Sequence, residues 1–453
     1  MEPANFRFGG GAADTLLNPL VAMAMLVIIG LIFTLPRHKV ITPFLLGCFT
    51  IPLGQVVVLA GIHFTVLRIL IIAALIRRAT SKTTSTEGKY PGGFNGIDRM
   101  VILWTIWVEL MCSLQFMDTQ VFIHNLGDFL DMFGGFLVVR YFIVDRETAR
   151  RAIKALAMVC IIQSVCMLNE QIAHVNVFGY IGGFGPGLTI RDGKIRSQGV
   201  LGSISGGAFA GSLIPLFLGL LAERKSRIIA CAALVGATIM VFTSNSSTSL
   251  LALAASALGI LMWPLRRQMR LVRWGISLTL IALHLIMKAP VWALIDRIDL
   301  TGSSSGYHRE QLVDNCIRHF GDWWLMGYKN YDQWGFCMFD MCNQFVVQAV
   351  LGGLVALVAY IAIFSRSFSA IGKARKKVEG NRRREWFLWC QGSTLFAVVV
   401  AHFGINYPAT TEVGLFTFWT LASMASFEVP QPVKVTAEIP RKAQILSNLV
   451  GAS

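Results

Sequence analysis

Apolar runs long enough to cross a lipid bilayer follow one another along almost the whole chain. Hydrophobic residues make up 55% of the sequence and charged residues 14%. The runs lie near residues 17–35, 41–60, 98–116, 121–143, 152–174, 203–222, 226–243, 248–265, 271–288, 343–365 and 386–404, and shorter or weaker candidates lie at 62–76 and 411–428. Because a helical span needs about 17 to 25 mainly apolar residues, this pattern predicts an all-α, polytopic integral membrane protein with about 12 to 13 spans. Residues 1–427 are expected to form one membrane domain, and the first span, which has no basic start or cleavage site before it, is expected to stay.

The Lys and Arg residues predict the orientation. Most of the 40 basic residues fall in segments that share one side if the loop at Arg37 is cytoplasmic, and short cytoplasmic loops collect such residues. Two segments, 175–202 and 290–342, then face the other side, while residues 428–453 form a cytoplasmic tail. The formal net charge of +15 reflects this bias and an attraction to anionic lipids. We therefore expect membrane lipids, and not nucleic acid, as partners.

Specific chemistry is expected in the long polar segment 290–342, because nearly all of the rest of the chain is expected to lie in the membrane. Residues 308–321 predict a helix whose apolar side carries Leu312, Val313, Cys316, Ile317 and Phe320. Arg309 falls on that side, so its guanidinium needs a buried anion or acceptor unless the side chain reaches back to the interface. His308 and His319 lie at the edge of the apolar side, either as bases near neutral pH or as plain surface residues.

The shorter outside segment carries positive charge just before a Gly- and Ser-rich span. Arg191, Lys194 and Arg196 lie there, against the orientation bias. The planar guanidinium of Arg196, backed by Lys194, suits bidentate contact with phosphate, and the alternative is a solvated turn that touches lipid headgroups. Glu170, at the outer end of the span at 152–174, is a candidate for activating a hydroxyl or for holding Arg196 in place.

Other polar and sulfur-containing residues are expected to be structural. Asp128 and Asp131 lie within a span, where ionisable groups need partners, and Arg68 or Arg140 could supply one. Three cysteines lie in or at the edge of the large outside segment: Cys316, Cys337 and Cys342. Two of them could form a disulfide in an oxidising compartment. No Cys and His spacing matches a metal site, so neither a metal nor another cofactor is expected.

Several short motifs occur in a characteristic order along residues 98–427. A glutamate ends one span at 168–170, a basic stretch leads into a small-residue helix at 194–211, and Thr243-Ser244-Asn245-Ser246-Ser247-Thr248 precedes another span. The long outside segment then carries motifs at 305–309 and 321–327 and closes on an Asn, an aromatic residue and a Gly-Leu-rich helix start at 343–354. This order resembles the O-antigen ligase and O-antigen polymerase family, bacterial inner-membrane glycosyltransferases that use polyprenyl-pyrophosphate glycans.

The resemblance implies roles for particular residues. Arg196 and Arg309, with Lys194 nearby, are expected to engage the pyrophosphate of the lipid-linked donor. Family ligases commonly have a histidine just before the Asn that ends the loop, whereas Cys342 precedes Asn343 here. This departure favours a polymerase over a ligase. It also leaves the base open among His308, His319, Glu170 and Asp340.

The expected reaction is an inverting, metal-independent transfer of glycan from an undecaprenyl-pyrophosphate donor. The acceptor is a hydroxyl of a glycan or lipid-linked sugar at the periplasmic face of the inner membrane. Four residues are expected to contact the glycan, namely Trp323, Trp324, Trp334 and Asn343, although the tryptophans could instead anchor the loop at the membrane interface. The alternative function is a flippase or exporter of lipid-linked glycans. A transporter should place cations in several spans, and Arg68 is the main one here.

Overall fold

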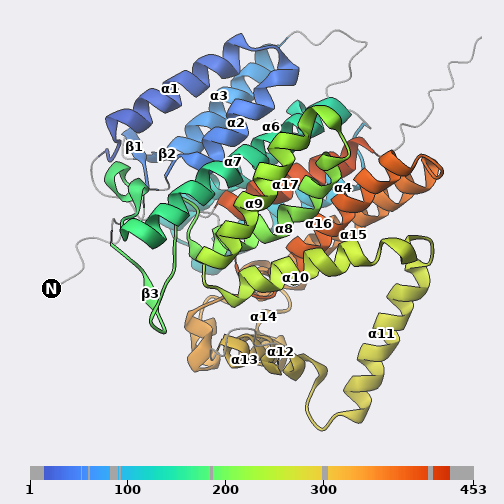
Figure 1. Cartoon of the computed structure of the whole chain (residues 1–453). Helices are drawn as coiled ribbons and strands as arrows, with labels where there is room; N and C mark the ends of the chain where they lie inside the picture. Colours follow the sequence, from blue (N-terminus) through green and yellow to red (C-terminus); the bar gives the residue numbers. More distant parts are fainter. Residues whose placement is uncertain are drawn as a thin grey trace, which may run out of the picture.

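The computed structural model describes residues 15–52, 54–59, 62–81, 90, 93–183, 187–297, 305–406 and 412–428. Most helices pack side by side in one bundle (Figure 1). The helices are α1 (Pro19–Thr34), α2 (Arg37–Thr50), α3 (Val66–Thr80), α4 (Gly96–Phe116), α5 (Thr119–Phe129), α6 (Gly135–Phe142), α7 (Arg146–Ala173), α8 (Ser203–Leu221), α9 (Arg227–Thr243), α10 (Ser247–Leu261), α11 (Met269–Ile286), α12 (Leu294–Arg297), α13 (Ser305–Arg318), α14 (Phe320–Trp323), α15 (Gln344–Lys377), α16 (Arg382–Ala401) and α17 (Glu412–Phe427). The strands are β1 (Val56–Leu59), β2 (Ile62–Thr65), β3 (Ile190–Arg191) and β4 (Lys194–Ile195).

The helices support the predicted class of all-α membrane protein. Among the described residues, six helical segments are long and apolar enough to cross a membrane: Thr119–Phe142, Arg146–Ala173, Ser203–Leu221, Arg224–Thr243, Met269–Ile286 and Gln344–Lys377. Shorter apolar helices accompany them at Pro19–Thr34, Ser247–Leu261 and Gly414–Phe427. Every run that the sequence marks as a span contains a helix. The number of spans and their orientation stay predictions, and the tail from residue 429 onward lies outside the described residues.

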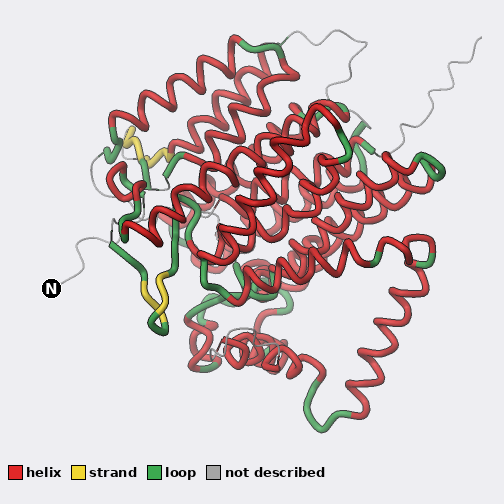
Figure 2. The backbone as a smooth tube through the Cα atoms, in the orientation of Figure 1, coloured by secondary structure: helices red, strands yellow, loops and turns green. Residues whose placement is uncertain are grey.

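The predicted span at 41–60 is shorter than its apolar run suggests, and the run at 62–76 begins with a strand. The helix α2 ends at Thr50, and β1 then pairs antiparallel with β2 in a small hairpin, which Figure 2 shows as two short yellow strands beside the helices. Pro52 lies two residues after the last helical residue and has no backbone donor to continue a helix. The β-branched Val56, Val57 and Val58 then favour an extended chain. Hydropathy alone therefore overestimated the helical length here.

Small residues let the central helices α8, α9 and α10 approach one another closely. A side chain at Gly207 of α8 would collide with the hydroxyl groups of Ser244, which follows α9, and Ser249, in the first turn of α10. Further along α8, Ser256 Oγ of α10 donates to the carbonyl of Gly211 at 2.7 Å. Contacts of this kind hold helices together where lipid removes the hydrophobic drive for association.

The helix α11 differs from the others because it has no buried residue. In Figure 1 it stands apart from the bundle, at the lower right of the view, and connects α10 to the large polar segment. Its apolar side chains, such as Leu271, Leu285 and Ile286, are each at least 70% exposed within the chain.

The described part of the large polar segment, residues 290–297 and 305–342, forms a small folded unit that we call the cap. Its core includes Leu312, Trp323 and Met338 and extends onto the first turns of α15 at Val346 and Val350. The predicted helix at 308–321 is present as α13, and Leu312 and Cys316 are buried as expected while Val313 is partly buried. Its later positions differ, because Ile317 is 45% exposed and Phe320, already at the start of α14, is 46% exposed.

The cap is joined to α15 where that helix breaks. Gly352 and Gly353 have non-helical backbone angles, and Gly353 has a φ of +67°, which suits glycine. The break leaves backbone groups without partners inside the helix, and the cap supplies some of them. Leu354 N donates to Trp324 O at 2.9 Å, and Tyr328 N donates to Val350 O at 2.8 Å.

Ion pairs within the bundle follow the prediction in part. Arg68 pairs with both Asp128 and Asp131, at 2.9 and 2.8 Å, which confirms it as their partner. Arg140 pairs instead with Asp98, at 3.2 Å. Cys316 and Cys342 are free thiols in the structure, and the side chain of Cys337 lies outside the described residues.

Candidate functional site

The two arginines that the sequence singles out are bound to the same short segment, the α9–α10 turn (residues 244–248). Arg196 Nε donates to the carbonyl of Asn245 at 3.1 Å. Arg309 Nη2 donates to Ser247 Oγ at 3.2 Å and to Thr248 Oγ1 at 2.9 Å. Residues more than a hundred positions apart in the sequence therefore meet at the start of α10.

The α9–α10 turn is held in shape by its own polar side chains. Asn245 adopts a left-handed backbone conformation with φ of 43°, which asparagine tolerates better than most residues. Its side-chain nitrogen donates to the carbonyl of Ile195 at 2.7 Å, and the hydroxyls of Ser244 and Ser249 lie 2.9 Å apart. The N-terminus of α10 follows at once, so its partial positive charge adds to that of the arginines.

Arg309 is buried where the cap contacts the bundle. It is 8% exposed, and its acceptor Thr248 passes its own hydroxyl hydrogen to the carbonyl of Gly404 at 3.0 Å. A side chain at Gly404 would lie 3.0 Å from Thr248 Oγ1 and 3.3 Å from Arg309 Nε, so glycine leaves the arginine its room. The prediction that Arg309 needs a buried acceptor is confirmed, and two hydroxyl groups of α10 are among its acceptors.

Glu170 holds the chain beside Arg196. It is 1% exposed, and its Oε2 accepts hydrogen bonds from the backbone N–H groups of Gln198 at 2.9 Å and Gly199 at 3.1 Å. Its Oε1 is buried without a hydrogen-bond partner among the described residues. Glu170 thus fixes the backbone that follows Arg196 and makes no direct contact with the guanidinium.

The remaining basic residues of this segment lie further out. Lys194 and Arg191 are exposed on the β3–β4 hairpin, whose turn has positive φ at Asp192 and Gly193 as two-residue hairpins prefer. Burial, together with the charge of Arg191, lowers the pKa of Arg196 from its usual value. An anion beside Arg196 would offset both effects.

The candidate bases occupy different surroundings in the cap. His308 is half-buried, and its Nε2 lies 2.8 Å from the carbonyl of Asp340. Because a carbonyl only accepts, Nε2 carries the hydrogen and Nδ1 is left as an acceptor. His319 Nδ1 lies 3.0 Å from the carbonyl oxygen of Asn315. The His319 ring stacks on Trp334, with ring centres 5.1 Å apart. The side chain of Asp340 is exposed.

Most of the residues expected to contact a glycan are used to build the cap. Trp334 is covered on one face by His319 and is stacked with Tyr328, 5.4 Å away and nearly parallel. Trp323 is 4% exposed and donates to Cys316 O at 2.7 Å. Asn343 caps α15 by accepting from the N–H groups of Phe345 and Val346. Of the four expected residues, only Trp324, at 46%, exposes a large part of its side chain.

Cys342, which stands where family ligases have a histidine, lies close to Arg309. Burial raises the pKa of its thiol to about 11, although the charge of Arg309 lowers it. The thiol is therefore neutral at physiological pH and cannot act as the base that a histidine would provide.

A cavity of about 260 Å³ adjoins this region and was not predicted from the sequence. It lies between the cap and the helices α4, α5, α15 and α17, and its polar lining includes Glu109, Asp128, Gln344, Gln348 and His402. Two of its lining residues are joined where Gln344 N donates to His402 O at 2.9 Å, two residues before Gly404. The sequence signal for this cavity was a pair of glutamines, Gln344 and Gln348, one turn apart at the start of an apolar helix.

The described ranges contain no group of three or more His, Cys, Asp or Glu residues that could hold a metal ion. No protein-family model matches the chain, and no curated protein matches it in sequence.

Proposed function

We propose that the protein is a glycosyltransferase that uses a polyprenyl-pyrophosphate-linked glycan as donor and a sugar hydroxyl as acceptor. The observation that carries this proposal is the attachment of Arg196 and Arg309 to the α9–α10 turn. Two guanidinium groups that contact one short segment beside a helix N-terminus suit a diphosphate, which has two phosphate groups to bind. The order of motifs that resembles the O-antigen ligase and polymerase family supports the same reading.

The proposed reaction needs charge stabilisation on the leaving group. The acceptor oxygen attacks the anomeric carbon, the bond from that carbon to the pyrophosphate oxygen breaks, and polyprenyl pyrophosphate leaves with the bonding electrons. Arg196 and Arg309 stabilise the negative charge that develops on the pyrophosphate. Attack from the side opposite the leaving group inverts the anomeric configuration.

His308 is the base that the geometry favours. It precedes Arg309 on α13, and its Nδ1 is the nitrogen left to accept a proton because Nε2 is committed to the carbonyl of Asp340. In this scheme Nδ1 takes the proton of the acceptor hydroxyl. His319 is stacked against Trp334, and Glu170 acts as a positioning residue that fixes the backbone next to Arg196.

The distribution of Lys and Arg supports a site on the periplasmic face of a bacterial inner membrane. The replacement of the ligase histidine by Cys342 favours chain polymerisation over ligation to a lipid acceptor. The competing function, a flippase, has less support because the intramembrane cation Arg68 is bound by two aspartates and so offers little to an anionic headgroup.

The test is incubation of the purified protein with a polyprenyl-pyrophosphate oligosaccharide and extracted envelope glycans in the presence of EDTA, followed by mass spectrometry. Glycan transfer with release of polyprenyl pyrophosphate supports the proposal. The changes Arg196→Ala and Arg309→Ala should each lower transfer about a hundredfold or more, since oxyanion-type contacts contribute that much.

Matched controls come from exposed arginines of the same segments. Arg191→Ala lies five residues before Arg196, and Arg318→Ala lies on α13, where the side chain is 72% exposed; both should transfer glycan normally. If the intact protein forms no product but moves a labelled donor across proteoliposomes, the flippase function is correct and the transferase proposal is wrong.

A further inference from the structure

A second basic site lies at the opposite end of the bundle from the α9–α10 turn. It is a cavity of about 560 Å³, bounded by the first turns of α7, by the connection from α8 to α9 and by the first turns of α16. Five arginines and one glutamate line it, namely Arg146, Arg150, Arg224, Arg383, Arg384 and Glu223. The helix α7 alone has 28 residues, or a length of about 42 Å, and Glu170 lies at its far end. The two sites therefore lie on opposite sides of the bundle and do not share residues.

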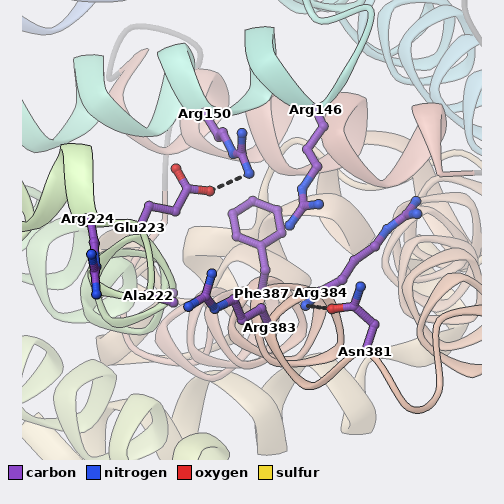
Figure 3. Close-up of a pocket in the computed structure, with 10 residues that line it drawn as sticks. Arg146, Arg150, Ala222, Glu223, Arg224, Asn381, Arg383, Arg384 and Phe387 are labelled. Atoms are coloured by element: carbon purple, nitrogen blue, oxygen red, sulfur yellow. Dashed lines mark hydrogen bonds and ion pairs between the residues drawn. The ribbon is translucent and has the colours of Figure 1, made fainter.

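The arginines converge on one space. In Figure 3, Arg146 and Arg150 extend from α7 toward Phe387, which lies in the middle of the view. The guanidinium of Arg146 lies 5.4 Å from the centre of the Phe387 ring. The preference for basic residues at cytoplasmic helix ends would be satisfied if these side chains pointed into water. That preference does not explain why side chains of three separate elements enclose one cavity.

The positive charge of the cavity is compensated only in part. Arg150 forms an ion pair with Glu223, and Arg384 lies 3.9 Å from Glu428. The Nε atoms of Arg146, Arg150 and Arg384 are buried and have no hydrogen-bond partner among the described residues. Buried donors without acceptors are costly, so the three arginines lack acceptors that an anion in the cavity could supply to their guanidinium groups.

We propose that this cavity binds a phosphate-bearing ligand, supplied either by the headgroup of an anionic phospholipid or by soluble phosphate or pyrophosphate. A carboxylate has two oxygens, whereas a phosphate presents oxygens in several directions and suits arginines that approach from different helices. The volume exceeds that of a bare phosphate, which leaves room for an ester group beside the apolar wall of Phe387 and Gly219. This site is independent of the glycosyltransferase proposal.

The test uses the full-length protein with one probe for each source. Native mass spectrometry counts lipids retained by protein taken from nanodiscs of phosphatidylcholine, alone or mixed with phosphatidylglycerol. Calorimetry in detergent measures binding of sodium pyrophosphate and of inorganic phosphate. We expect Arg146→Gln and Arg384→Gln each to weaken binding of the ligand about tenfold, because a hydrogen bond to a charged group contributes roughly this much.

Two further variants separate binding from folding. Glu223→Gln removes the carboxylate that pairs with Arg150 and should tighten binding, a gain that misfolding cannot produce. Lys225→Gln changes an exposed residue of the same connection that does not line the cavity and should bind as the wild type does.

The outcomes separate the two sources. Retention of phosphatidylglycerol that depends on Arg146 and Arg384, without pyrophosphate binding, identifies a lipid headgroup. Pyrophosphate or phosphate binding with the same dependence, without lipid retention, identifies a soluble ligand. Equal binding of every probe by the wild type, Arg146→Gln, Arg384→Gln and Glu223→Gln overturns the proposal.

Discussion

Arg309 Nη2 and Thr248 Oγ1 lie 2.9 Å apart, and this hydrogen bond joins the cap to the first turn of a bundle helix. Thr248 in turn donates to the carbonyl of Gly404, so one hydroxyl links α13, α10 and the end of α16. The hydroxyl groups of Ser247 and Thr248 are neutral acceptors that orient the guanidinium. An arginine held in this way is prepared for an anionic ligand.

The first prediction concerns Thr248 as a positioning residue. Thr248→Val keeps the shape of the side chain but removes the nearer of two hydroxyl acceptors of Arg309 and the donor to Gly404, so kcat/KM for glycan transfer should fall about tenfold or more. Thr248→Ser keeps the hydroxyl and should stay within about threefold of the wild type. Equal activity of the two variants would show that the hydroxyl does not position Arg309.

The second prediction separates two roles of Glu170. If Glu170 holds the backbone at Gln198 and Gly199, then Glu170→Gln, which retains a carbonyl acceptor, should keep most of the activity. Glu170→Ala leaves two backbone donors unpaired, at a cost of about 1–3 kcal/mol each, and should lose activity through Arg196. A general base would behave differently, since both variants would then be inactive in the same transfer assay.

The third prediction is the pH dependence of Cys342 alkylation. The pKa of the thiol is raised from its ordinary 9.0 to about 11 by burial, and only the thiolate reacts. At pH 8 the thiolate fraction is about a hundredfold lower than for a thiol of ordinary pKa. The rate of iodoacetamide labelling at this residue, followed by peptide mass spectrometry, should rise tenfold per pH unit up to about pH 11. Fast labelling at pH 8 would mean that Cys342 is ionised and could replace the family histidine.

The fourth prediction concerns the break in α15. Gly353 has φ of +67°, and a side chain there would lie 2.8 Å from the carbonyl oxygen of Leu325. Gly353→Ala should therefore destabilise the folded protein by about 2–3 kcal/mol. The measurement is the thermal unfolding midpoint in detergent.

Gly372→Ala is the matched control, because Gly372 lies in the same helix with no atom within 4 Å of the added methyl group. Alanine is the better helix former, so this change should raise stability slightly. A Gly353→Ala variant as stable as Gly372→Ala would show that the helix does not need its break.

Local patterns in the sequence predicted much of the fold. Apolar runs located the bundle helices, and the periodicity of the cap predicted α13 together with the burial of Arg309. The same patterns failed at residues 56–65, where apolar side chains are equally suited to strand and helix, so hydropathy could not detect the β1–β2 hairpin. The helical periodicity also predicted burial of Ile317 and Phe320 wrongly, because their exposure depends on how α13 and α14 pack.

The candidate site was predictable as a set of residues but not as an arrangement. Arginine chemistry pointed to Arg196 and Arg309, yet nothing local says that both bind the α9–α10 turn. Trp323 and Trp334 looked like sugar platforms because the sequence does not show which rings are stacked or buried. Contacts between distant segments, such as His319 on Trp334 and Thr248 on Gly404, exist only once the chain has folded.

The break at Gly352 and Gly353 also has a mechanical consequence. The carbonyl groups that the break leaves without a helical partner accept hydrogen bonds from Tyr328 N of the cap and from the side chains of Gln115 and Trp107 of α4. The distance is 2.8 Å in each case. The cap thus supplies a hydrogen bond to the backbone of α15 where the helix breaks, and this bond fixes its position along that helix. If the cap tilts to admit a substrate, residues 344–351 must move with it as one unit, and Gly353 is the hinge of that movement.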